Sequence, residues 1–122
     1  MKLAIPTVGT GGLEAERSGH FGQCDCFTIV DIENGEVVAT SVLDNPPHEE
    51  GGCLRPVGLL AENGATAIVA AGMGGRPLMA FNDAGITVYF DNMTPNVGAV
   101  ALRAARGELP IMSLDKACHE EH

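Results

Sequence analysis

The feature that most constrains the fold is an alternation of helical and extended apolar patterns over the second half of the chain. Apolar residues recur at helical spacing in three segments, 54–63, 76–84 and 95–105. Two short apolar segments, 66–71 and 86–90, separate these predicted helices. Such alternation is typical of parallel strands joined by right-handed helical crossovers. We therefore expect an α/β domain with helices on both faces of a sheet.

The first half of the chain predicts a β-hairpin with one strand before it. The segments 26–32 and 36–43 are rich in β-branched residues, and Asn34-Gly35 between them is a strong signal for a tight turn. A strand-like run at 2–6 comes first. The predicted order is β-β-β-α-β-α-β-α, and one mixed five-stranded sheet in a three-layer domain is its simplest arrangement.

Length and charge disfavour several classes of protein. At 122 residues the chain fits one domain, predicted over 1–107, with a flexible tail over 108–122. A formal net charge of −9 disfavours binding to nucleic acid or to an anionic membrane. The segment 1–6 lacks the features of a signal peptide, and no apolar run approaches the roughly 20 residues that span a bilayer. We expect a cytoplasmic protein and, because no apolar stripe is left over after the core is assigned, a monomer.

Metal binding is the first chemistry that the sequence offers. Soft and borderline metals prefer thiolate and imidazole ligands, and cysteines in a reducing cytoplasm are free thiols. Most of the cysteines and histidines of the chain fall in predicted loops or at the ends of strands. The inventory is Cys24, Cys26, Cys53, Cys118, His20, His48, His119 and His122.

Two groups in this inventory have an alternative interpretation. Cys24 and Cys26 are two residues apart, so their thiols point to one side if the segment is extended. The alternative is that both are small buried core residues. The second group lies in the tail and consists of Cys118, His119 and His122. It could bind a metal ion, or these residues could be incidental in a flexible tail. The candidate metal ligands are His20, Cys24, Cys26 and Cys53, and below them Cys118, His119 and His122.

An anion-binding turn is the second candidate. The segment 72–76 (GMGGR) follows a buried strand and opens a helix, where free backbone N–H groups and the helix dipole favour an anion. Arg76 adds positive charge. The segment matches neither the G-x-G-x-x-G motif nor a P-loop. The alternative is a tight turn that needs small residues.

Catalysis is disfavoured by the placement of the acidic residues. Asp31, Glu33 and Asp44 lie on or beside the hairpin, and the strand at 2–6 carries no carboxylate. A two-metal nuclease would need carboxylates on its central strands. No spacing supports a Ser–His nucleophile pair. We expect a protein that is not an enzyme.

Several short motifs occur along the chain in a characteristic order and spacing. They are 1–6 (MKLAIP), His20-Phe21-Gly22, 27–33 (FTIVDIE), Asn34-Gly35, Asn45-Pro46, Gly51-Gly52 and 71–74 (AGMG). In these motifs the chain resembles the dinitrogenase iron–molybdenum cofactor family of nitrogenase accessory proteins over about residues 1–107. Stand-alone relatives include small orange proteins that hold a molybdenum–copper sulfide cluster.

The resemblance implies a ribonuclease H-like fold and a non-catalytic role. The chain would bind, store or deliver an anionic metal–sulfur cluster of Fe–Mo–S or Mo–Cu–S type, exchanged with a donor or acceptor protein of cluster assembly. His20 is the direct ligand that the resemblance favours. The implied contacts to the cluster come from Gly11, Gly12, His20, Phe21, Gly22, Gly72, Met73, Gly74, Gly75 and Arg76. The alternative function is a small regulatory or scaffold domain that binds a protein partner without metal.

Overall fold

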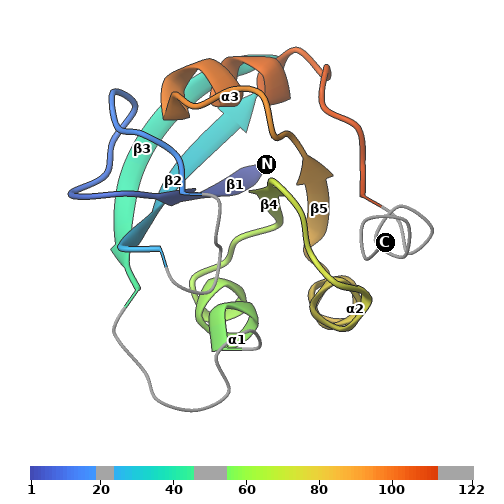
Figure 1. The fold of residues 1–122 in the computed structure, drawn as a ribbon. Coiled ribbons are helices and arrows are strands. Elements are labelled where there is room, and N and C mark those ends of the chain that lie inside the picture. The colour runs from blue at the N-terminus through green and yellow to red at the C-terminus, as the bar shows by residue number, and fades with distance from the viewer. Residues whose placement is uncertain (19–23, 46–54, 113–122) are drawn as a thin grey trace.

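In the part of the chain that the structure describes, five strands form one mixed sheet in the order β3-β2-β1-β4-β5 (Figure 1). The central strand β1 (Lys2–Thr7) pairs antiparallel with β2 (Cys26–Glu33) and parallel with β4 (Ala67–Ala70). β3 (Glu36–Asp44) pairs antiparallel with β2, and β5 (Thr87–Phe90) pairs parallel with β4. The mixed five-stranded sheet predicted from the sequence is confirmed.

The computed structural model describes residues 1–18, 24–45 and 55–112.

The hairpin between β2 and β3 turns at Asn34 and Gly35, whose φ angles of 54° and 79° are both left-handed. Two consecutive left-handed residues match the right-handed twist of the flanking strands, which explains the preference for Asn-Gly at this turn.

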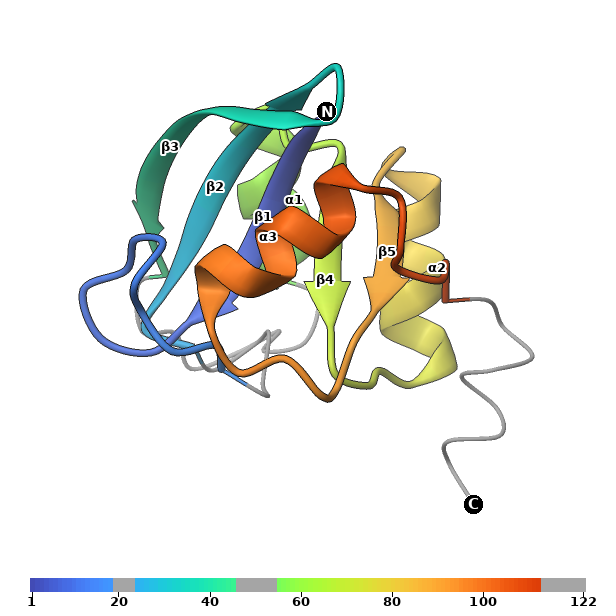
Figure 2. The same ribbon diagram turned by 90° about the horizontal axis from the view of Figure 1, so that it is seen from above.

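The helices cover both faces of the sheet, as predicted. α1 (Arg55–Glu62) and α2 (Gly75–Asp83) pack on one face, and α3 (Val97–Ala105) packs on the other (Figures 1 and 2). Side chains of β1 alternate between the two cores: Ala4 faces α1 and α2, whereas its neighbours on either side face α3. Every residue of β4 is buried, as expected for a strand covered on both faces.

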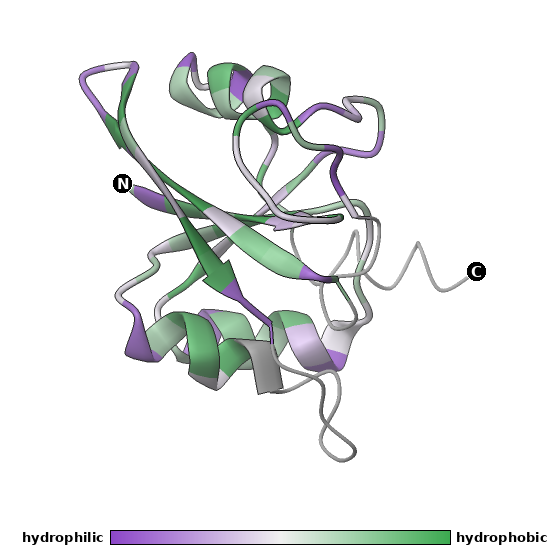
Figure 3. Ribbon diagram, turned by 90° about the vertical axis from the view of Figure 1, so that its left-hand side faces the viewer, coloured by the Kyte–Doolittle hydropathy of each residue, from purple (hydrophilic) through white to green (hydrophobic). Residues whose placement is uncertain are grey.

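Apolar residues make up most of the strands, and hydrophilic residues lie mainly in turns and at helix ends (Figure 3). This arrangement is the three-layer α/β domain expected from the sequence. It is also compatible with the ribonuclease H-like fold that the resemblance implies. Within the part of the chain that the structure describes, no helix is long and apolar enough to cross a membrane.

The start of α3 differs from the sequence prediction. The helix begins at Val97 rather than at Pro95, and Asn96 is its N-cap, with Oδ1 accepting a hydrogen bond of 2.9 Å from the Ala99 amide. The amides of Val97 and Gly98 donate to carbonyl oxygens of residues 13–15. The N-terminus of α3 is therefore satisfied by the protein itself.

The end of the domain also differs from the prediction of a flexible tail from residue 108. Leu109 and Met112 are buried in the two cores. The Phe90 amide donates to the Pro110 carbonyl at 2.9 Å, and the Met112 amide donates to the Val88 carbonyl at 2.7 Å. Residues 108–112 therefore pack along β5 and belong to the fold. The rest of the predicted tail, 113–122, lies outside the described residues.

Candidate functional site

The carboxyl ends of the three parallel strands meet at one edge of the sheet. After β1 the chain continues toward β2, on the opposite side of β1 from β4, so the strand order reverses between β1 and β4. In open α/β sheets, ligands collect at the carboxyl ends of the strands beside such a reversal. The Ser18 amide donates to the Pro6 carbonyl and the Asp91 amide donates to the Ala70 carbonyl, which holds the following segments at this edge.

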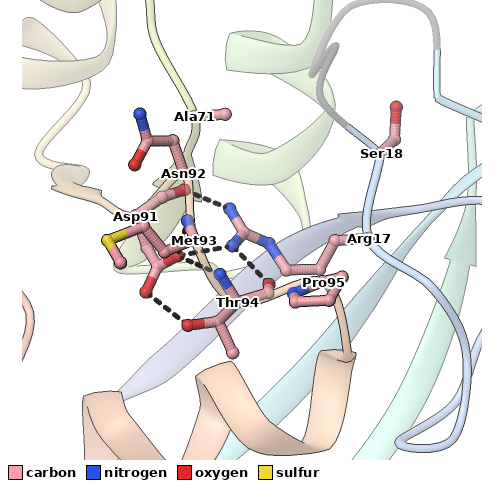
Figure 4. Close-up of a pocket in the computed structure, with 8 residues that line it drawn as sticks. All are labelled: Arg17, Ser18, Ala71, Asp91, Asn92, Met93, Thr94 and Pro95. Atoms are coloured by element: carbon pink, nitrogen blue, oxygen red, sulfur yellow. Dashed lines mark hydrogen bonds and ion pairs between the residues drawn. The ribbon is translucent and has the colours of Figure 1, made fainter.

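A pocket of about 280 Å³ opens at this edge (Figure 4). This volume lies just below the ~300–1,000 Å³ typical of small-molecule sites, so the pocket suits a compact ligand. Segments that follow β1, β4 and β5 all contribute to it. Its lining residues are Arg17, Ser18, Ala71 and 91–95.

The pocket contains a buried ion pair that the sequence analysis missed. Figure 4 shows the guanidinium of Arg17 directed at the loop 91–95. Its Nη1 lies 3.0 Å from Oδ1 of Asp91 and 2.8 Å from the Thr94 carbonyl oxygen, and its Nη2 lies 2.8 Å from the Asp91 carbonyl oxygen. The position of Asp91 could have identified it as a candidate site residue, because it directly follows the predicted strand 86–90. Nothing in the sequence indicated that Asp91 pairs with Arg17.

The carboxylate of Asp91 is saturated with hydrogen bonds. Oδ1 also accepts from the amides of Met93 and Thr94, each at 2.8 Å, and Oδ2 accepts from the Thr94 hydroxyl at 2.9 Å and Arg103 Nη1 at 2.8 Å. Burial by itself raises the pKa of Asp91. The hydrogen bonds from Met93 and Thr94 and the charge of Arg17 outweigh burial, so the pKa is lowered. Asp91 is therefore a structural anion rather than a proton donor near neutral pH.

The glycine-rich turn 72–75 leads from β4 into α2, as predicted, and its last residue, Gly75, is the first residue of the helix. Gly74 is the N-cap of α2 with φ −69° and ψ 166°, and no side chain among the described residues caps this helix. None of Gly72, Gly74 and Gly75 has a left-handed φ, so backbone conformation does not require glycine there. Glycine at these positions also allows another group to approach the backbone closely. Arg76 is exposed in the first turn.

Met73, in the same turn, is 6% exposed and packs in the core under α1 and α2. Its side chain therefore fixes the turn on the sheet. Direct contact between Met73 and a cluster, which the resemblance implies, stays a prediction.

The glycine loop after β1 has a different character from the turn 72–75. Gly11 and Gly12 have φ angles of 87° and 104°, which favour glycine. A Cβ on Gly11 would lie 2.9 Å from both γ-carbons of Val42. The Gly12 amide already donates to Thr28 Oγ1 at 3.1 Å. These contacts give both glycines a structural role, and their implied contact to a cluster stays a prediction.

The structure buries both candidate thiols near the start of β2. Cys24 is 5% exposed and packs in the core, where Asn45 Nδ2 lies 3.6 Å from its Sγ. Cys26 is 2% exposed, and its Sγ donates to the Gly9 carbonyl at 3.5 Å. Burial raises the pKa of Cys24 to about 11 and also raises the pKa of Cys26. Because thiolates are the metal-binding form, this environment favours the core alternative for both residues.

A family model described as dinitrogenase iron-molybdenum cofactor matches residues 1–107. The chain belongs to this family. It is 34% identical over 97 residues to an uncharacterized protein of Methanocaldococcus jannaschii, covering 77% of each chain. The apo form of the orange protein from Desulfovibrio gigas has a TM-score of 0.79 and 25% identity, covering 92% of each chain. The crystal structure of PH0822 has a TM-score of 0.77 and 28% identity, covering 92% of this chain and 96% of the other. The resemblance stated from the sequence is therefore confirmed.

The charged side chains that line the pocket are paired with each other. They are Arg17 and Asp91, and the amides of Met93 and Thr94 also donate to the Asp91 carboxylate. In 1–18, 24–45 and 55–112, no three His, Cys, Asp or Glu side chains come together as a metal-binding group. The remaining predicted site residues, and also His48, lie outside the described residues. These site residues are His20, Phe21, Gly22, Cys53, Cys118, His119 and His122.

Proposed function

We propose that the protein binds and carries an anionic metal–sulfur cluster, or a precursor of one, at the carboxyl edge of the sheet. One observation carries this proposal. The glycine turn 72–75 leads into α2, which no described side chain caps, and it adjoins the pocket at the β1–β4 reversal through Ala71. The description of the family names the iron-molybdenum cofactor. A compact anionic cargo of this kind would bind at the carboxyl edge of the sheet.

Charge complementarity supports an anionic cargo. A cluster with several negative charges needs N–H donors and cations around it, because the chain carries a net charge of −9. The exposed Arg76 stands at the start of α2, and Arg17 lines the neighbouring pocket. Glycine carries no Cβ that would keep a ligand away from the backbone, which suits Gly72 and Gly74 to this role.

The environment of Asp91 supports binding rather than catalysis. It is the one carboxylate among the described residues that line the pocket, and five donors occupy its oxygens. A carboxylate held ionised in this way is unsuited to proton transfer at neutral pH. We therefore propose that the protein stores or delivers its cargo rather than converting it. The proposal keeps the expectation from the sequence of a cytoplasmic monomer that meets a donor or acceptor protein.

The direct ligand in this proposal is His20, which the family resemblance favours. The cluster would be of Fe–Mo–S or Mo–Cu–S type, and any contribution from Cys53 or from the tail residues would add to it. We propose that Cys24 and Cys26 are core residues, because both thiols are buried and have raised pKa values.

One observation favours the alternative of a partner-binding domain without metal. β3 is an edge strand of the sheet, and its Val38 and Val42 are 54% and 45% exposed. An open edge with apolar side chains is a surface to which another chain can add.

Metal reconstitution separates the two functions. Protein purified without oxygen is incubated with molybdate, copper or iron together with sulfide, and metal content and absorption are measured. The carrier function gives stoichiometric metal with charge-transfer bands, and both decrease in the His20→Ala variant. Protein that stays colourless and metal-free under every condition supports the partner-binding domain.

A further inference from the structure

The two edges of the sheet are protected differently. At the β5 edge, residues 110–112 run beside the strand: the Phe90 amide donates to the Pro110 carbonyl, and the Met112 amide donates to the Val88 carbonyl. At the other edge, no described segment pairs with the outer side of β3 (Figure 2). β3 is the longest described strand, with nine residues, and it contains no Lys or Pro, which commonly protect an exposed edge. The β3 edge is therefore open in the part of the chain that the structure describes.

The ladder between β2 and β3 determines which backbone groups of β3 point outward. The Asn45 amide donates to the Asp25 carbonyl at 3.3 Å, so these two residues form a hydrogen-bonded pair. Hydrogen-bonded pairs alternate along an antiparallel ladder, so the odd-numbered residues of 39–43 bond to β2. The even-numbered residues of 40–44 therefore direct their amides and carbonyls away from the sheet. The one register shift of the ladder lies before residue 39, so this stretch is regular.

The side chains of β3 offer apolar contact at this edge. Residues 38–42 are all exposed, so side chains on both faces of the strand's middle are accessible. Val38 and Val42 are 54% and 45% exposed. Val37 and Leu43, in contrast, are half-buried against the two cores and anchor the strand. A strand added beside β3 would therefore both pair its backbone and bury exposed valines.

The charges around the β3 edge are all negative. The segment 18–54 contains seven acidic residues and no Lys or Arg. At one end of β3, Glu33 and Glu36 face each other across the hairpin; at the other end lie Asp25 and Asp44. None of these four carboxylates forms an ion pair with a described Lys or Arg. Like charges placed opposite each other destabilise a ladder, so cations at both ends of β3 would be favourable.

We propose that β3 is a docking strand for an extended, basic segment of a partner protein, which adds to the sheet beside residues 39–44. The backbone of this segment pairs with the outward amides and carbonyls, its apolar side chains cover Val38 and Val42, and its Lys or Arg residues meet the two carboxylate pairs. The inference goes beyond the proposed function, because the cargo takes no part in it and the edge is the same with or without metal.

Charge decides between this occupant and two others. Antiparallel pairing of two copies of β3 about Thr40 would place Glu36 of one chain opposite Asp44 of the other, and it would join two chains that each carry a net charge of −9. Nucleic acid is itself anionic, so the same carboxylates repel it. A basic polypeptide segment satisfies both the unpaired backbone and the unpaired charges.

The probe for this surface is the synthetic peptide Lys-Arg-Val-Thr-Val-Thr-Val-Arg-Lys, which combines basic ends with an extended centre. Fluorescence anisotropy of the labelled peptide measures its binding to the full chain, and NMR measures amide hydrogen exchange in the complex. We expect saturable binding and slower exchange at Thr40 and Val42, whose amides gain acceptors; Ser41 and Leu43, already bonded to β2, should exchange slowly throughout. The same peptide N-methylated at its three central residues keeps its charge but loses backbone donors, and it should bind about tenfold more weakly.

Changes in the chain test the backbone and the charge separately. Thr40→Pro removes an outward amide without removing a bond to β2, and Pro is tolerated on edge strands, so it should weaken peptide binding about tenfold. Asp44→Asn should weaken binding about threefold at low salt and less at high salt. Asp83→Asn makes the same change in charge on α2 and should leave affinity nearly unchanged. If Thr40→Pro fails to fold, the N-methylated peptide makes the same test from the side of the ligand.

Each contrary outcome overturns the inference. Absence of saturable binding, or equal binding of the N-methylated peptide, would mean that the β3 backbone recruits no strand. Equal effects of Asp44→Asn and Asp83→Asn would indicate nonspecific attraction to an acidic protein. Slower exchange elsewhere, but not at Thr40 and Val42, would place the peptide on another surface. A dimer in sedimentation equilibrium that Thr40→Pro dissociates would assign the edge to a second copy of the chain instead.

Discussion

Arg17 and Asp91 lie 74 residues apart in the sequence and form a buried ion pair, with 3.0 Å between Nη1 and Oδ1. The pair joins the segment that follows β1 to the segment that follows β5. The Arg17 amide adds a hydrogen bond of 2.8 Å to the Pro95 carbonyl. Two walls of the candidate site are therefore held together by contacts that also stabilise the domain.

Removing the Asp91 side chain should destabilise the protein strongly. Asp91→Ala leaves Arg17 buried without a counter-charge, and loss of one partner of a buried pair costs about 3–5 kcal/mol. Urea denaturation measures the change in the free energy of unfolding. Asp83, which is exposed at the end of α2, provides the control. Asp83→Ala should change that free energy by less than about 0.5 kcal/mol, and a similar loss in both variants would contradict the role of the ion pair.

Stability should fall in acid because of Asp91. Its pKa is lower in the folded protein than the ~3.9 of an unfolded chain, so the ionised form favours folding. This contribution is present above the unfolded pKa and is lost as the pH falls through the folded pKa. The free energy of unfolding should therefore decrease as the pH falls below about 5 and through the folded pKa of Asp91. Asp91→Asn should show a shallower decrease, and identical pH profiles would contradict the assignment.

A side-chain N-cap added to α2 should raise the stability of the domain and lower its affinity for an anion. Gly74→Asp places a carboxylate at an N-cap with suitable backbone angles, which should stabilise the domain by about 0.5–1 kcal/mol. The same carboxylate would occupy an amide at the helix N-terminus and repel an anion, so affinity for tetrathiomolybdate should fall. Asn82→Asp introduces the same charge at the other end of α2 and should leave affinity nearly unchanged. Unchanged affinity in Gly74→Asp would exclude the turn 72–75 from the site.

The Cys24 thiol should be unreactive in the folded protein. A pKa raised from 9.0 to about 11 lowers the thiolate fraction at neutral pH roughly a hundredfold, and burial restricts access further. Alkylation by iodoacetamide, resolved by peptide mass spectrometry, should be slow at Cys24 in native conditions and fast after unfolding in denaturant. Fast alkylation of the native protein would restore Cys24 as a candidate ligand.

The order of the elements could be predicted from the sequence because local signals determine it. Asn34-Gly35 fixes the hairpin through two left-handed residues, and the apolar segment 66–71 contains the fully buried β4. The cap of α3 could not be predicted in the same way. Both Thr94 and Asn96 are suitable cap residues, but the Thr94 hydroxyl is bonded to Asp91.

Parts of the site and of the domain boundary depend on long-range contacts, which leave no local pattern. The Arg17–Asp91 pair forms only when the sheet brings β1 and β5 to one edge. Residues 108–112 lack a helical or strand pattern, and they are held because Leu109 and Met112 fill the two cores. The turn 72–75, in contrast, was predicted because its glycines and Arg76 are contiguous in the sequence.

The most direct test of the central claim maps the bound anion on the protein by two-dimensional NMR. Isotope-labelled protein is titrated with tetrathiomolybdate, and amide shifts are followed residue by residue. If the carboxyl edge of the sheet binds the cargo, the amides of 71–76 and 91–94 should shift together and saturate. The hairpin turn Asn34-Gly35, at the opposite edge, should not shift. Shifts confined to β3, or no saturable shift at 71–76 and 91–94, would contradict the claim that this edge is the cargo site.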